Sequence, residues 1–186
     1  MGWPVLTLSE ICSSVFAGGD VPKDRLSKFR TAEFTVPIYS NGEKNKGLYG
    51  FTDIARVTEP SITVSARGTI GYSEVRFEPF LPVVRLIVLT PNLELVELEY
   101  LKYVIQSMDF KNSGSSIPQL TVPMIKDYSC EIPPISEQKR IVAILDKAFA
   151  DIEQARAKTE QNLKNARELF ESYLQKVFSK RGEGWE

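Results

Sequence analysis

Basic and amide side chains gather in three glycine-punctuated stretches of the sequence, and these residue types suit contacts to nucleic acid. Lysine and arginine bind phosphate, asparagine and glutamine can bond adenine through two atoms, and lysine or arginine can bond guanine. Glycine between them lets the backbone come close to a ligand. The candidate DNA-binding residues are Asn41, Lys44, Asn45, Lys46 and Tyr49 in the first stretch, Arg67 and Thr69 in the second, and Lys111, Asn112, Ser113, Ser115, Ser116 and Gln119 in the third.

Each of these residues also has a simpler interpretation as part of an ordinary polar turn at the surface. Arg67 has a further alternative, in which its turn is structural and a carboxylate or backbone carbonyls hold the guanidinium. A second basic group, diluted by neighbouring aspartates, consists of Lys23, Arg25, Lys28 and Arg30. This group could contact phosphates or only keep a loop in solvent.

The residue inventory argues against catalysis and against a metal site. The chain has no histidine, the commonest general base and metal ligand, and two cysteines alone do not make a structural zinc site. An adenine methyltransferase of the restriction type would need an Asn/Asp-Pro-Pro-Tyr/Phe motif, but Pro133 and Pro134 lie between isoleucines. No phosphate-binding Walker loop and no nucleophile–base pair are recognisable. We therefore expect no catalytic residue, no metal ligand and no enzyme activity in this chain alone.

Composition and charge are those of an ordinary globular protein. Hydrophobic residues make up 42% and charged residues 25% of the 186 residues, and no apolar run approaches the roughly 20 residues that cross a membrane. The sequence has no signal peptide, so we expect a cytoplasmic protein with free thiols and no membrane contact. The net charge is −1, with 13 basic against 15 acidic residues in 1–135 and 10 against 9 in 136–186. DNA binding would therefore require basic groups collected on one face, with the acids turned away.

The first part of the chain, residues 1–135, has the pattern of a mixed α+β domain with several short strands. Alternation and β-branched residues predict strands over 61–65, 75–77 and 83–89. Apolar residues at helical spacing predict a helix over 98–106. Glycines between these runs are typical of turns.

A long helix is predicted to follow, over residues 136–180. The prolines at 133 and 134 end the preceding segment, Ser136 suits the N-cap, and no proline or glycine follows until Gly182. At about 1.5 Å per residue the helix would be long enough, near 60 Å, to need another long helix as a partner. A heptad-like stripe predicts a coiled-coil arm that pairs through Ile141, Leu145, Ala148, Ile152, Ala155, Thr159, Asn162, Ala166, Leu169 and Tyr173. The alternative is a helix partly packed on its own domain and partly solvated.

The two ends of the chain resemble each other. Gly2-Trp3 near the start and Gly184-Trp185 near the end contain the only tryptophans. The tail, residues 181–186, therefore has the form of the start of a second copy of the unit. We interpret the chain as one repeat of a two-repeat architecture, as a half-subunit or a truncated form.

Four stretches in order along the chain resemble the specificity subunits of type I restriction-modification systems. The opening, with Trp3, Leu6 and Leu8, is similar to the start of their target-recognition domains. Residues 65–71 (Ser-Ala-Arg-Gly-Thr-Ile-Gly) and 114–120 (Gly-Ser-Ser-Ile-Pro-Gln-Leu) resemble two of their loops. Residues 132–141 (Ile-Pro-Pro-Ile-Ser-Glu-Gln-Lys-Arg-Ile) are similar to the segment that leads into their spacer helix.

The resemblance implies a non-catalytic subunit that reads double-stranded DNA. Such subunits usually carry two recognition domains, one for each half of a split site, held apart by two long helices. The helices also bind methyltransferase subunits, which hold S-adenosylmethionine, while this chain would bind no cofactor itself. A restriction subunit joins indirectly.

This chain has one recognition domain and one helix, so a homodimer through the helix would restore the two-domain arrangement and read a palindromic split site. The near-neutral charge keeps a second hypothesis open. In it the chain is a helical scaffold that binds or competes for the methyltransferase subunit without binding DNA itself.

Overall fold

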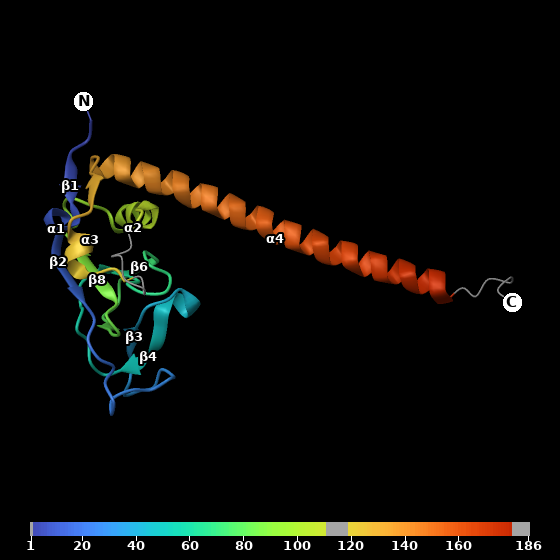
Figure 1. Cartoon of the computed structure of the whole chain (residues 1–186), viewed down its shortest axis with the longest axis horizontal. Coiled ribbons are helices and arrows are strands. Elements are labelled where there is room, and N and C mark those ends of the chain that lie inside the picture. The colour runs from blue at the N-terminus through green and yellow to red at the C-terminus, as the bar shows by residue number, and fades with distance from the viewer. Residues whose placement is uncertain (1, 111–118, 180–186) are drawn as a thin grey trace. The chain divides into compact units, whose positions relative to one another are not determined.

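The computed structural model describes residues 2–110 and 119–179, and the chain divides into two compact units, Met1–Val142 and Ala143–Glu186. In the first unit, strands alternate with long loops and short helices (Figure 1). The described part of the second unit is one continuous helix. The α+β fold with a long C-terminal helix, expected from the sequence, is confirmed.

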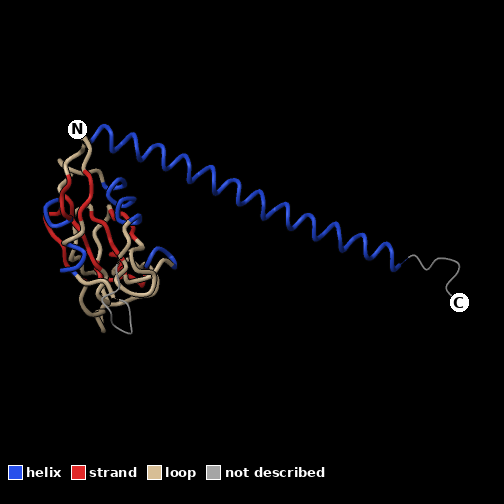
Figure 2. The backbone as a smooth tube through the Cα atoms, turned by 45° about the horizontal axis from the view of Figure 1, so that its top comes forward, coloured by secondary structure: helices blue, strands red, loops and turns tan. Residues whose placement is uncertain are grey.

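The described strands form three sheets, drawn red in Figure 2. The largest is antiparallel and has the order β2 (Cys12–Ala17), β8 (Ile87–Pro91), β5 (Ser61–Val64), β6 (Ser73–Arg76). A second sheet has the order β4 (Leu48–Thr52), β3 (Val36–Tyr39), β7 (Leu81–Pro82), with β3 and β7 parallel. The third pairs β1 (Val5–Thr7) with β9 (Ser129–Glu131).

The main hydrophobic core joins the four-stranded sheet to the short helices α1 (Leu8–Ile11), α2 (Leu98–Ser107) and α3 (Val122–Lys126). The predicted helix at 98–106 is confirmed as α2, which buries Leu98, Leu101 and Ile105 on one face. Its N-terminus is capped by the side chain of Glu97, which accepts a hydrogen bond from the backbone N–H of Tyr100. Packing of this amphipathic face, rather than helix propensity, holds α2 in place.

The strand predicted over residues 61–65 is confirmed as β5, and that over 75–77 is found two residues earlier as β6. The prediction of one strand over 83–89 is wrong in its first half. Strand β8 begins only at Ile87, and Val83–Leu86 forms a tight turn closed by a hydrogen bond of 3.1 Å from the Leu86 N–H to the Val83 carbonyl. The residue types in this turn suit a strand, but hydrogen bonds to other loops hold the backbone in the turn conformation.

The long helix, α4 (Ile135–Ser179), has 45 residues and is about 68 Å long at 1.5 Å per residue. It begins one residue before the predicted position, and Ser136 lies in its first turn rather than at the cap. The carbonyl of Pro134 accepts the first N–H groups, from Glu137 at 2.8 Å and Gln138 at 3.0 Å. The helix start is therefore set by the end of the proline pair.

Gln138 is fully buried and anchors the first turn of α4 in the globular unit. Its side-chain oxygen accepts from the N–H of Glu97 at 2.7 Å, and its nitrogen donates to the carbonyls of Leu95 at 3.0 Å and Pro133 at 2.8 Å. A buried amide with all three bonds made is stable where an unpaired one would be costly.

Candidate nucleic-acid interface

Asn41 ties together three segments that are far apart in the sequence. Its side-chain nitrogen donates to the carbonyl of Val84 at 2.6 Å, and its oxygen accepts from the N–H of Ala66 at 2.8 Å. Next to it, the N–H of Gly42 donates to the hydroxyl of Ser65 at 2.6 Å. The first and second candidate stretches therefore meet at the turn before β8. Both functional ends of the Asn41 amide have backbone partners, so its role in the free protein is to hold these segments together.

The turn over Val83–Leu86 is strained and firmly held. Val84 (φ 53°) and Arg85 (φ 60°) both have left-handed backbone conformations. Asparagine and glycine are the usual residues at these two positions of a tight turn, and a β-branched residue such as valine is an outlier there. The N–H of Val84 donates to Gly19 at 2.8 Å, and that of Arg85 donates to Gly18 at 3.2 Å. Surrounding bonds thus hold a conformation that the turn residues do not favour.

Gly18 is required for this close packing of main chain on main chain. A Cβ added at Gly18 would lie 2.6 Å from the carbonyl carbon of Pro82, closer than side-chain carbons approach backbone. The Gly18-Gly19 pair directly after β2 was the one sequence signal that could have indicated the turn, because glycine marks places where two backbones meet.

Arg67 is held by Gln119, so the second stretch meets the described end of the third. The Nε and Nη2 atoms of Arg67 donate to the side-chain oxygen of Gln119 at 3.2 and 2.7 Å. The N–H of Leu120 also donates to the carbonyl of Ala66 at 2.9 Å. Among the described residues the partner of the guanidinium is an amide, not the carboxylate or backbone carbonyls of the structural alternative, and Arg67 remains exposed. Within the same residues, the Nη1 group of Arg67 and the side-chain nitrogen of Gln119 donate no hydrogen bond.

Two adjoining cavities lie beside these segments. One of about 450 Å³ is lined by Gly18, Asp20, Arg67, Val84 and Arg85, among others. The other, about 330 Å³, is lined by Arg85, Gln119 and Thr121 among others. Arg85 borders both. The sequence interpretation did not single out Arg85, because the residue lies inside what appeared to be a strand.

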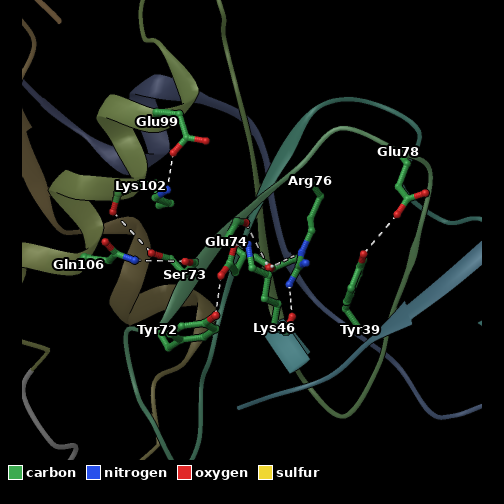
Figure 3. Close-up of polar contacts among 11 residues, drawn as sticks. Tyr39, Lys46, Tyr72, Ser73, Glu74, Arg76, Glu78, Glu99, Lys102 and Gln106 are labelled. Atoms are coloured by element: carbon green, nitrogen blue, oxygen red, sulfur yellow. Dashed lines mark hydrogen bonds and ion pairs between the residues drawn. The ribbon is translucent and has the colours of Figure 1, made fainter. Parts of the chain in front are cut away.

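The first stretch contains a second left-handed turn, positioned by a buried arginine. Within η1 (Lys44–Gly47), Asn45 has φ 50° and Lys46 has φ 54°. Arg76 is only 7% exposed. Its Nη2 donates to the carbonyl of Lys46, and its Nε donates to the hydroxyl of Thr63 at 3.1 Å (Figure 3). The guanidinium carbon lies 3.6 Å from the centre of the Tyr39 ring. Burial lowers the pKa of Arg76 from its usual value.

Acidic groups moderate the charge of this turn. The ammonium of Lys46 lies 3.7 Å from the carboxylate of Glu74, which also accepts a hydrogen bond from the Tyr72 hydroxyl at 2.5 Å (Figure 3). Burial, and then the bond to Glu74, raise the pKa of Tyr72 to about 12. Lys44 and Asn45 are exposed, so they present the polar groups of the turn to solvent.

The remaining candidates have varied surroundings. Tyr49 is half-exposed on β4, and Thr69 is exposed in the tight turn, where its carbonyl accepts from the N–H of Tyr72 at 3.1 Å. Five candidates lie outside the described residues: Lys111, Asn112, Ser113, Ser115 and Ser116. Contact of any candidate with DNA stays a prediction.

In the second basic group, Arg25 is paired with Asp53 through Nε at 3.0 Å and through Nη2. The hydrogen bond from Arg25 lowers the pKa of Asp53. Lys23, Lys28 and Arg30 are exposed. One charge of this group is therefore engaged within the chain, and the others face solvent.

The arm, residues 143–179, exposes a broad apolar face. Of the predicted pairing residues in this range, Leu145 is partly buried and the others are exposed, and the Thr159 hydroxyl donates to the Ala155 carbonyl of its own helix at 2.8 Å. Large exposed side chains omitted from the predicted stripe lie beside it at heptad spacing: Phe149, Leu163, Phe170 and Val177. The apolar face is therefore wider than the stripe, and its small residues lie next to large ones.

Among residues 2–110 and 119–179, no helix is long and apolar enough to cross a membrane. Nor do the described residues include a group of three or more His, Cys, Asp or Glu side chains that could hold a metal ion. Cys12 and Cys130 are free thiols in this structure.

The family model of the type I restriction modification DNA specificity domain matches residues 1–164. The chain therefore belongs to that family. It is similar to two putative type I specificity subunits of Mycoplasma pneumoniae. S.MpnORF89P is 39% identical over 143 residues, which cover 77% of this chain and 42% of the relative. S.MpnORF507P is 34% identical over 147 residues, which cover 79% of this chain and 40% of the relative.

Solved structures share the fold. A chain from a structure on complex assembly and conformational transition of the type I R-M system has a TM-score of 0.71 at 22% identity, covering 89% of this chain and 43% of that one. The HsdS subunit from Thermoanaerobacter tengcongensis has a TM-score of 0.60 at 19% identity, covering 82% and 38%. The type I S subunit from M. genitalium has a TM-score of 0.59 at 18% identity, covering 97% and 47%. The present chain spans less than half the length of each of these relatives.

Proposed function

We propose that this chain is the specificity subunit, or half-subunit, of a type I restriction-modification complex and reads one half of a split DNA site. The observation that carries the proposal is the meeting of three loops at two cavities bordered by Arg67, Arg85 and Gln119. These side chains offer hydrogen-bond donors on firmly held backbone, which suits phosphates and base edges. Family membership gives the DNA-specificity domain its context.

In this proposal the chain itself catalyses nothing. It directs methyltransferase subunits, and indirectly a restriction subunit, to the site, and S-adenosylmethionine is held by the methyltransferase. One observation supports this division of labour: the arm offers an apolar face of the kind that a helical partner covers.

The experiment is to sequence modified bases in DNA from cells that contain the chain and its methyltransferase partner, with and without the chain. A chain-dependent methylation motif with a fixed gap is the expected result. Binding of the purified complex should fall steeply with salt, because phosphate contacts release counterions. No chain-dependent motif and no base preference in binding would refute the proposal.

We further propose that the arm pairs two copies of the chain, which would then read a palindromic split site. Leu163, Phe170 and Val177 are more than half exposed at heptad spacing, and pairing would remove this apolar surface from water. Light scattering of the purified chain at tens of micromolar should show a dimer, and Phe170→Glu should give a monomer. Gln161→Glu is the matched control, since Gln161 lies away from the seam and should leave the dimer intact. A wild-type monomer would contradict the pairing.

A scaffold that binds the methyltransferase without binding DNA is the second candidate, favoured by the net charge of −1. Retained methyltransferase binding by the full chain, with no DNA affinity at any salt concentration, would support the scaffold. Salt-dependent binding with a base preference would exclude it.

A further inference from the structure

The end of β2 and the start of β8 bring two charged residues to the same cavity. These strands are antiparallel, and Ala17 and Ile87 are their last paired residues. The N–H of Gly18 donates to the carbonyl of Leu86 at 2.8 Å, which continues the contact past the sheet. Asp20, just after β2, and Arg85, just before β8, both line the cavity of about 450 Å³.

Arg85 combines a fixed backbone with a free side chain. Its N–H is bonded to Gly18, and the preceding residue is bonded through both its N–H and its carbonyl. The guanidinium is exposed and makes no hydrogen bond or ion pair to another described residue. None of its five donors is bonded within residues 2–110 and 119–179, and they form a planar fork that matches a pair of acceptors. Discrimination between nucleobases requires a side chain that is held on a fixed backbone and can direct its hydrogen bonds to a base edge.

The carboxylate of Asp20 favours a base edge, rather than a phosphate, as its own neighbour in this cavity. The carboxylate is exposed, and within the described residues no ion pair joins it to Arg85 or Arg67. It would repel a phosphate placed beside it, whereas it would accept a hydrogen bond from an amino group. In the major groove, a G·C pair presents the guanine O6 and N7 acceptors next to the cytosine N4 amino donor. Arg85 can donate to the two guanine acceptors, and Asp20 can accept from the cytosine amino group.

We infer that Arg85 and Asp20 are specificity-determining residues that read one G·C pair of the DNA half-site. The guanidinium of Arg85 donates to O6 and N7 of guanine, and the carboxylate of Asp20 accepts from N4 of the paired cytosine. The inference rests on the proposed function and adds to it a base pair and the two residues that select it.

Arg67 has a different role in the same cavity. Its Nε and Nη2 groups are bonded to Gln119, so its fork is partly occupied. Among the described residues only Gln119 accepts a hydrogen bond from this guanidinium, so its remaining donors suit a phosphate that sets the register of the DNA. Arg67 therefore provides the matched control for Arg85, as an arginine that borders the same space.

The test measures binding of the full chain, with its methyltransferase partner, to duplexes in which each base pair of the methylated half-site is replaced in turn. The wild type should prefer G·C at one position by about 5- to 150-fold, the range of one good bidentate contact. Arg85→Lys keeps the charge but loses the fork, and it should remove most of that preference. Arg67→Ala should weaken all duplexes alike and lower the salt slope by about 1.

Asp20→Asn and base analogues separate the two contacts. Thymine presents an acceptor where cytosine presents N4, so Asp20→Asn should relax discrimination against A·T at that position alone. 7-Deazaguanine, which lacks N7, should weaken the wild type several-fold and leave Arg85→Ala unaffected, while inosine should bind as guanine does. Thermal melts should show that each variant is folded.

Two failures are distinguishable. If the wild type discriminates among bases but Arg85→Lys and Asp20→Asn leave its profile unchanged, the inference is wrong and the proposed function stands. If the wild-type complex has no base preference, both are wrong.

Discussion

Relief of the strain at Val84 should stabilise the protein. A left-handed conformation costs a residue with a Cβ atom about 1–2 kcal/mol, and Val84 has φ 53° with a side chain that is 44% exposed. Little packing is therefore lost when the side chain is changed. Val84→Asn, which tolerates this conformation, should add about 1 kcal/mol to the free energy of unfolding. Val84→Gly should add less, because glycine has about 0.5–1 kcal/mol more freedom to lose on folding.

The assay is thermal and urea unfolding of the three proteins together with Val84→Ala. For a chain of this size, 1 kcal/mol corresponds to a rise of about 2–4 °C in Tm. Alanine also removes the branched, exposed side chain but keeps a Cβ at positive φ, so it should recover much less than asparagine. If Val84→Ala stabilises as much as Val84→Asn, the gain comes from removal of an exposed apolar group, and the strain argument is refuted.

Four further predictions concern other sites. Gly68→Ala should destabilise by about 1 kcal/mol in urea unfolding, because Gly68 has φ 71° although no atom lies within 4 Å of the added Cβ; an unchanged midpoint would contradict this. Gln138→Ala should cost about 3 kcal/mol in the same assay, because it leaves three hydrogen bonds to backbone unmade; a loss below 1 kcal/mol would show that water replaces them. Burial raises the pKa of Cys12 to about 12 and that of Cys130 to about 11. Both thiols should therefore react slowly with Ellman's reagent at pH 8, and rapid labelling of the folded protein would count against this. The folded thiols hold their protons more tightly than unfolded thiols of pKa 9.0. Their contribution to stability is therefore complete below pH 9 and is lost as the pH rises toward 11–12. Urea unfolding at pH 8 and pH 10 would detect this loss.

Periodicity predicted the elements that depend on local pattern. Leu98, Leu101 and Ile105 recur at helical spacing and form the buried face of α2, and the uninterrupted run after Pro134 forms α4. In these segments the residues that determine the structure lie within a few positions of one another, so the sequence shows them together.

The turn before β8 could not be predicted in the same way. Val84 and Arg85 are residue types that suit a strand, but their conformation is fixed by hydrogen bonds to the carbonyls of Gly18 and Gly19 and by one from the side chain of Asn41. All three residues lie more than 40 positions away. Tertiary contacts override local preference here. The roles suggested for Arg85 and Asp20 depend on the same distant contacts.

Asn41 illustrates a related limit. Its residue type suits adenine, and sequence alone cannot show that both ends of its amide are bonded to backbone. Gln119 is similar, since its side-chain oxygen accepts from Arg67. Which polar groups are left for a ligand follows only after the hydrogen bonds within the protein are counted.

The exposure of the arm has a consequence for how long the chain would survive in a cell. An isolated helix without tertiary packing is only marginally stable in water, and such segments open locally at little cost in free energy. Proteases cleave segments that open in this way, whereas a partner that covers Leu163, Phe170 and Val177 would hold the helix closed. Unassembled copies would be degraded faster than assembled ones, so the abundance of the chain would follow the supply of whatever pairs with its arm.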